Sequence, residues 1–186
     1  MSAPQLAPAY PSADLSAPAE LVATPEGPYR SAELAIWDEV AGSLTNHPHI
    51  WGSAEEGAMV LGEEVDELWD DVRANHIGHA RVEAAQVGAM AVRFIADLYE
   101  PLGPGPDRCR AAMAQQRQVR AVVGPPGRLL SSSHEAFGFL RREYDALWSA
   151  IRFDDPARPA ATRVAAMAVR FIAEITSAAP VVGRKP

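Results

Sequence analysis

Six acidic residues fall within nine positions of this sequence: Glu63, Glu64, Asp66, Glu67, Asp70 and Asp71. An acidic run is usually a solvated helix face, so the place of each residue around the helix decides whether it can do chemistry. At about 100° per residue, Glu64 and Glu67 lie along the edge of an apolar stripe. Asp66 and Asp70 point to solvent, and Glu63 lies behind Glu67. The pattern predicts that Glu64 and Glu67 border the protein core.

A further carboxylate, Glu83, is in line with a second apolar stripe, because apolar residues follow it at 4, 7 and 11 positions. A carboxylate placed there must be neutralised, paired or ligated, since an isolated buried charge is very costly. Gln86 follows one helical turn later and offers an amide oxygen. If the two helices form a hairpin, Glu64, Glu67, Glu83 and Gln86 converge.

Several oxygen ligands without cysteine or paired histidine are typical of a site for a hard cation, and Mg²⁺ fits because it accepts a few carboxylates and retains waters. Zinc is disfavoured, since the histidines His47, His49, His76 and His79 fall in predicted turns without cysteines. Trp51, just before the acidic helix, is equally suited to stacking on a base and to packing in the core.

The elements that position these side chains are predicted to be helices, because apolar residues recur at helical spacing and no segment alternates as a strand does. Ser53 with Glu56, and Ser132 with Glu135, form capping-box patterns that mark two helix starts. The expected helices run from after Ser31 to before His47, from Ser53 to about 72, and over about 79–99, 107–122, 132–152 and 159–177. The fold class is therefore all-α, a bundle of six helices.

The chain is an internal duplication. The heptapeptide AMAVRFI occurs at Ala89–Ile95 and again at Ala166–Ile172, and each copy follows an aligned D-x-L-W. Trp69 and Trp148, the tryptophans of these motifs, are 79 positions apart and are expected in the core. We expect two three-helix halves, each covering the apolar face of the other. Because the heptapeptide arginines Arg93 and Arg170 occur in both copies, they are expected to serve structure, for example as ion pairs between helices.

The second copy lacks most of the candidate ligands. Glu64 is retained as Glu143, but the counterparts of Glu67, Glu83 and Gln86 are Ala146, Ala160 and Arg163. The second half is therefore not expected to hold a cation. Arg163 is expected to be a surface arginine, with contact to substrate phosphates as the alternative.

Four segments follow from composition. Residues 1–30, rich in Ala, Pro and Ser, are expected to be a disordered tail. Residues 31–100 form the first helical repeat with the acidic site, 101–180 form the degenerate second repeat, and 181–186 form a C-terminal tail.

The acidic residues resemble the motifs of the MazG-like all-α nucleoside triphosphate pyrophosphohydrolases, relatives of the dimeric dUTPases. That family carries E-E-x-x-E on one helix and E-x-x-D on the next. The segment from Glu63 to Glu67 matches the first element, and Glu83-Ala84-Ala85-Gln86 matches the second except at its last position. The resemblance covers about Ser53–Tyr99, with a degenerate echo over Ser132–Ser177.

The resemblance implies that Glu64, Glu67 and Glu83 hold Mg²⁺, that Glu63 assists or orients water, and that a nucleoside triphosphate is cleaved to a monophosphate and pyrophosphate. Gln86 removes one negative charge from the ligand set, which implies weaker metal binding, one ion instead of two, or a binding protein without catalysis. Sites in this family form between subunits, so the fused second copy would make a pseudo-dimer within one chain, and a homodimer stays open.

Net charge and composition argue against some classes of partner and favour one cellular location. The formal charge of −7 is spread along the 186 residues, which argues against nucleic acid as a partner. No window is apolar enough for a membrane helix. A single cysteine, Cys109, and an N-terminus without signal-peptide features favour the cytoplasm, and the Arg- and Ala-rich composition suggests a GC-rich bacterial or phage genome. The alternative to the hydrolase is a noncatalytic helical scaffold that binds a nucleotide or a protein.

Overall fold

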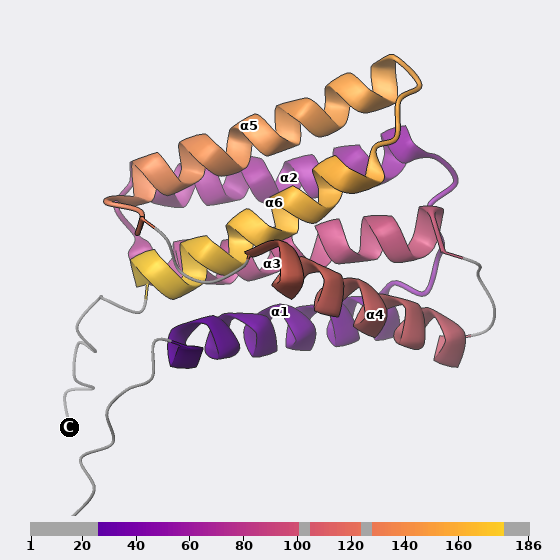
Figure 1. Ribbon diagram of the computed structural model, residues 1–186, viewed down its shortest axis with the longest axis horizontal. Helices are drawn as coiled ribbons and strands as arrows, with labels where there is room; N and C mark the ends of the chain where they lie inside the picture. Colours follow the sequence, from indigo (N-terminus) through magenta and orange to yellow (C-terminus); the bar gives the residue numbers. More distant parts are fainter. Residues whose placement is uncertain (1–25, 101–104, 124–127, 177–186) are drawn as a thin grey trace, which may run out of the picture.

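The computed structural model describes residues 26–100, 105–123 and 128–176 (Figure 1). Its helices are α1 (Glu26–Asn46), α2 (Ala54–Arg73), α3 (Ile77–Leu98), α4 (Gly105–Val123), α5 (Ser133–Arg152) and α6 (Arg158–Arg170), followed by a short π-helix, η1 (Phe171–Thr176). Every regular element in these ranges is a helix, which confirms the all-α prediction. The predicted turns between α2 and α3 and between α5 and α6 are also present.

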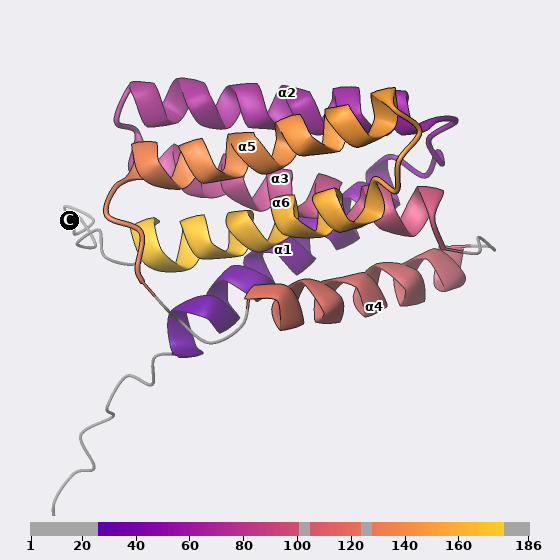
Figure 2. The ribbon, with the colours of Figure 1, turned by 45° about the horizontal axis from the view of Figure 1, so that its top comes forward.

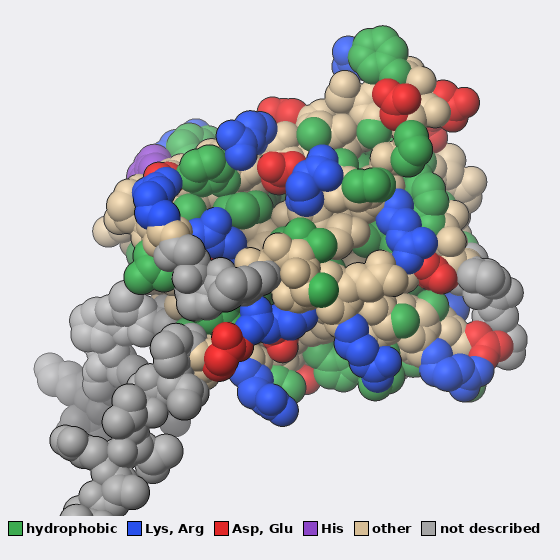
Figure 3. All heavy atoms as spheres, in the orientation of Figure 1, with side chains coloured by type: hydrophobic (Ala, Val, Ile, Leu, Met, Phe, Trp, Pro, Cys, Tyr) green, Lys and Arg blue, Asp and Glu red, His purple; other side chains and the backbone are tan. Residues whose placement is uncertain are grey.

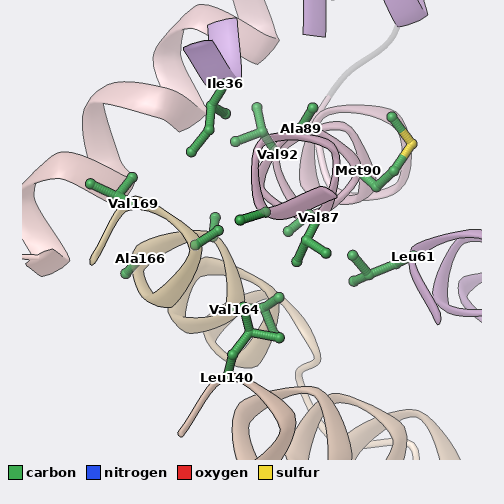
Figure 4. Close-up of a cluster of buried hydrophobic side chains, with 14 of the residues drawn as sticks. Ile36, Leu61, Val87, Ala89, Met90, Val92, Leu140, Val164, Ala166 and Val169 are labelled. Carbon is green, nitrogen blue, oxygen red and sulfur yellow. The ribbon is translucent and has the colours of Figure 1, made fainter. Parts of the chain in front are cut away.

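The helices pack as three layers of two. In Figures 1 and 2, α3 and α6 lie in the middle, α2 and α5 cover one side of them, and α1 and α4 cover the other. The layers meet in one core, in which Ile36 of α1, Leu61 of α2 and Val164 of α6 point toward Val87 of α3 (Figure 4). The middle helices carry the most buried surface, and the two outer layers present their polar faces to solvent.

Local signals fix the starts of α2 and α5. Ser53 caps α2 by accepting a hydrogen bond from the Glu56 amide at 3.2 Å, and Ser132 caps α5 in the same way with the Glu135 amide at 3.1 Å. Each glutamate side chain accepts from the residue before the cap rather than from the cap itself, at 2.6 Å from Gly52 and 2.7 Å from Ser131. Both predicted helix starts are confirmed, with this one-residue shift in the reciprocal bond.

Glycine allows a close approach between α2 and α5. A Cβ at Gly62 would collide with the hydroxyl of Tyr144, which donates to the Ala58 carbonyl at 3.0 Å and accepts from Trp148 Nε1 at 2.6 Å. The two long outer helices are therefore joined through a buried tyrosine. The other motif tryptophan, Trp69, is partly buried and stacks on Phe137 with ring centroids 4.9 Å apart, so both tryptophans pack against the core as expected.

The first helix begins earlier than its sequence predicted. It starts at Glu26 instead of after Ser31, and Tyr29 is buried and donates a hydrogen bond to Glu174 at 2.9 Å. The predicted disordered tail of residues 1–30 is therefore wrong for residues 26–30, because burial against a distant helix stabilises this turn. The rest of that tail, the 101–104 linker and the C-terminal tail at 181–186 lie outside the described residues.

The turns after α2 and α5 share a backbone conformation in the two halves of the chain. The turn after α2 contains Asn75 at φ 58° and the turn after α5 contains Asp154 at φ 56°, a left-handed conformation that short polar side chains tolerate. These correspondences agree with an internal duplication, and the division into two equivalent three-helix repeats stays a prediction. On the face shown in Figure 3, basic side chains are scattered, with acidic ones among them. Among the described helices, none combines the length and apolarity of a membrane span.

Candidate metal centre

The α2–α3 hairpin brings three glutamates together. Glu64 and Glu67 on α2 and Glu83 on α3 each offer a carboxylate oxygen, and these oxygens lie within 4.8 Å of one another. The convergence that the sequence pattern led us to expect is present. Asp66 and Asp70 point to solvent, as their places on the helix predict. Among the described residues, these three form the only cluster of three or more potential side-chain metal ligands of the His, Cys, Asp or Glu type.

The cluster is at the edge of the core. Glu64 and Glu83 are half-buried and Glu67 is exposed, so Glu83 lies beside the apolar stripe of α3 rather than inside the core. Burial, followed by the charges of Glu67 and Glu83, raises the pKa of Glu64 from 4.5 to about 7. Burial, followed by the charges of Glu67 and Asp71, also raises the pKa of Glu83. The site therefore favours either a proton or a cation.

In the described part of the chain, the three glutamates lack a positively charged partner. Among the described residues, no lysine or arginine forms an ion pair with Glu64, Glu67 or Glu83. His79 acts to lower the pKa of Glu83, but its influence comes last among the causes of the shift. Three carboxylates at this separation repel one another unless a cation or protons lie among them.

Gln86 contacts the same cluster. With its amide nitrogen turned toward the carboxylates, it donates to Glu64 Oε2 at 2.7 Å and to Glu83 Oε2 at 2.8 Å. The opposite amide orientation would present the oxygen, which is the ligand that a cation needs. Glu63 is exposed on the neighbouring face of α2, and its charge adds to the pKa rise of Glu64.

A groove of about 520 Å³ adjoins the cluster. It is bordered by α1, α2, α3 and the segment between α1 and α2, through Glu39, Gly42, Ser43, Asn46, His47, His49, Trp51, Glu56, Val60, Glu63, Glu64, Gln86, Met90 and Arg93. Its volume is in the range of small-molecule sites. The acidic cluster and a groove of ligand size therefore share Glu64 and Gln86.

Tertiary packing settles the place of Trp51. Its side chain is 8% exposed, and its ring, like that of Phe94, lies close against Gly57. The Arg93 guanidinium lies over the indole, 4.9 Å from the ring centroid. Trp51 therefore packs in the core with little of its surface exposed, so stacking on a base is not its role in this conformation.

The second half supplies a comparison within the chain. Glu143, the counterpart of Glu64, pairs with Arg163, the counterpart of Gln86, through Arg163 Nε and Glu143 Oε2 at 2.7 Å. Ala146 and Ala160 stand where the first half has Glu67 and Glu83. Arg163 is at the surface as expected, and its guanidinium neutralises the one carboxylate that remains. Within the residues that the structure describes, the carboxylates of the first half have no such cation beside them.

The histidines do not build a second centre. The rings of His76 and His79 are 5.9 Å apart, and His76 Nδ1 lies 3.4 Å from Asp71. His47 and His49 are exposed and border the groove.

The sequence analysis did not identify Asp97 and Arg108, which act together with Arg93 at the groove wall. Arg93 has the structural role expected of it, but its ion-pair partner is Asp97, one turn later on the same helix. Asp97 also binds Arg108 of α4. A signal was present, because both heptapeptide arginines are followed by an acidic residue four positions later, and Arg170 pairs with Glu174.

Comparison of the chain with protein-family models, with curated proteins and with solved structures found no match. The function is therefore inferred from the geometry of the site and from the motif resemblance.

Proposed function

We propose that the protein is a Mg²⁺-dependent nucleoside triphosphate pyrophosphohydrolase that releases a nucleoside monophosphate and pyrophosphate. One observation carries this proposal. Glu64, Glu67 and Glu83 converge beside a ligand-sized groove with no lysine or arginine of the described residues paired to them, while the corresponding place in the second half is neutralised by Arg163.

The donor set fits a hard cation. Glu64, Glu67 and Glu83 would hold Mg²⁺ through carboxylate oxygens, with the Gln86 amide oxygen as a further ligand. The bound ion would polarise a water molecule and offset the negative charge of the phosphates. The raised pKa values of Glu64 and Glu83 support this assignment, because a cation would replace the protons that the crowded carboxylates favour.

The fold of the chain fixes the positions of the candidate metal ligands. The ligands project from two packed helices, so their spacing is fixed before a substrate arrives. Glu63 borders the groove next to Glu64 and would orient the attacking water. The water oxygen would bond to the α-phosphorus and the water would release a proton to solvent, while the bond from that phosphorus to the oxygen bridging to the β-phosphorus would break and pyrophosphate would leave.

The groove supports a ligand that extends beyond a bare phosphate. Besides Glu64 and Gln86, it is lined by Asn46, His47 and His49, whose exposed side chains provide hydrogen-bonding groups. A nucleotide has both an anionic end for a metal and a polar organic end for such a wall. The exposed, unpaired Cys109 is compatible with the cytoplasmic setting that we infer.

The second candidate is a noncatalytic scaffold that binds a nucleotide or a protein. It is favoured by Gln86, whose amide nitrogen can bridge Glu64 and Glu83 and thus satisfy them without a metal. The groove also offers few cations for phosphates, since Arg93 is buried and engaged elsewhere. This candidate predicts no dependence on Mg²⁺ and indifference to substitution of Glu83.

Pyrophosphate release decides between the two candidates. The purified chain is assayed with a panel of ribonucleoside and deoxyribonucleoside triphosphates, with Mg²⁺ and with a chelator. The hydrolase proposal expects release from at least one nucleotide, abolished by chelation. Absence of release from the whole panel in Mg²⁺ would favour the scaffold.

A further inference from the structure

The segment between α1 and α2 is held from inside by two arginines. Arg93 of α3 donates to the carbonyl oxygens of His47 at 2.7 Å and His49 at 2.5 Å. Arg108 of α4 donates to the carbonyl of the intervening Pro48 at 2.7 Å. Three successive carbonyl groups of a segment without regular structure are thus bound by two guanidinium groups.

Asp97 fixes both guanidinium groups. Its Oδ2 lies 3.1 Å from Arg93 Nε, and its Oδ1 lies 2.9 Å from Arg108 Nη2. Arg93, Asp97 and Arg108 are only 3%, 2% and 5% exposed. Two buried cations share one carboxylate, so the backbone carbonyls are needed to complete their hydrogen bonds. Movement of the segment would leave buried charge unsatisfied, which keeps the segment in place.

The held segment forms one wall of the groove. His47, His49 and Trp51 border the same groove as Glu64 and Gln86. Because the carbonyls of His47 and His49 are bound from the inside, the outer surface of the segment is the part that a ligand meets. The imidazoles of both histidines are exposed there.

The other half contains a matching arrangement with different chemistry. Arg170 binds Glu174 and the Arg128 carbonyl, and Glu174 accepts from Tyr29 of α1. Tyr29 and Arg108 are 79 positions apart, the same offset as the two motif tryptophans. Tyr29, from the first helix of the first half, thus contacts the Arg170–Glu174 pair of the second half. Arg108, from the first helix of the second half, contacts Asp97 of the Arg93–Asp97 pair in the first half. Tyr29 supplies a neutral hydroxyl, whereas Arg108 supplies a cation and reaches the groove wall.

We propose that Arg108 is a positioning residue for ligand binding: it holds the His47–Trp51 segment as the wall that receives the nucleoside end of a metal-bound nucleotide. The identity of the ligand rests on the proposed function. The half that lacks the acidic ligands then serves the site by supplying Arg108. This gives the degenerate half a direct part in the binding of substrate.

The test compares Arg108→Met with Tyr29→Phe, the change at the corresponding place in the other half, in the full chain. Amide hydrogen exchange is measured over residues 47–52 without ligand. Affinity is measured in Mg²⁺ for non-hydrolysable α,β-imido nucleoside triphosphates and for tripolyphosphate, which lacks a nucleoside. Arg108→Lys keeps the charge but not the paired contacts, and it replaces Arg108→Met if urea unfolding shows that the latter does not fold.

Arg108→Met is expected to speed exchange in the segment and to weaken nucleotide binding about tenfold, as expected for loss of an ordering charge-assisted bond. Tripolyphosphate affinity stays within about twofold, and Tyr29→Phe changes neither property of the groove wall. Unchanged nucleotide affinity despite faster exchange, or equal weakening of tripolyphosphate binding, overturns the proposal. Failure of the hydrolase function has a different signature, which is wild-type protein that binds the analogues but releases no pyrophosphate.

Discussion

Replacing Glu83 by Gln should separate chemistry from stability, because this residue repels its neighbours in the metal-free protein. The pKa of Glu64 is raised from 4.5 to about 7, first by burial and then by Glu67 and Glu83. At about 1.36 kcal/mol per unit the whole shift corresponds to ~3 kcal/mol, and solvent screening at this half-exposed position reduces it to ~1–2 kcal/mol. Glu83 comes third among the causes, after burial and Glu67, so removing its charge should stabilise the metal-free protein by no more than about 0.5 kcal/mol.

The same change should damage metal binding and turnover. Lewis-acid stabilisation by a metal is worth several kcal/mol and each 1.36 kcal/mol is about tenfold in rate, so losing a ligand should lower turnover about 100-fold or more. At Mg²⁺ about 100 times its Kd, wild-type protein should gain roughly 2.7 kcal/mol, which is a Tm rise of roughly 5–10 °C for a chain of this size. Glu83→Gln should gain much less at the same concentration.

The assay is Mg²⁺-dependent pyrophosphate release, together with Tm measured in chelator and in Mg²⁺. Glu143→Gln is the matched control, because Glu143 corresponds to Glu64 in a half that lacks the other ligands and it pairs with Arg163. The control should change turnover little. Full turnover by Glu83→Gln would refute the assignment, and so would loss of turnover in the Glu143 variant alone.

Three further outcomes are expected. In chelator, the free energy of unfolding should fall as pH rises from about 4.5 to about 7 and then level off, because the folded state binds the Glu64 proton more tightly than the unfolded state does. Urea unfolding across this pH range tests this dependence, and a Glu64→Gln variant with the same slope would contradict it. Gly62→Ala should cost about 1–2 kcal/mol through collision with the Tyr144 hydroxyl, and Tyr144→Phe in the same chain should recover part of that loss in chemical denaturation. Arg163→Ala should cost no more than ~1 kcal/mol, as for other half-exposed ion pairs, and calorimetry showing new Mg²⁺ binding near Glu143 would count against our reading of the second half.

Features that depend on neighbours three or four positions apart could be predicted from the sequence. Helical periodicity gave six helices, Ser53 and Ser132 marked two of their starts, and the turns between the paired helices were foreseeable. Glu64, Glu67 and Glu83 could be expected to converge, because a short turn between two helices makes a hairpin and the register of each helix is set by its own apolar stripe. Such interactions are local, so their pattern is visible along the chain.

Features that depend on residues far apart in the sequence became visible only in the tertiary structure. The first turn of α1 forms because Tyr29 meets Glu174, 145 positions away, and local composition there resembles a tail. Trp51 is suited by type to both a core and a ligand surface, and only the position of Arg93 and of the helices around it places the ring inside. The bond between Arg108 and Asp97 joins the two halves of the chain. Burial and charge pairing of this kind arise when distant segments pack, so no local pattern specifies them.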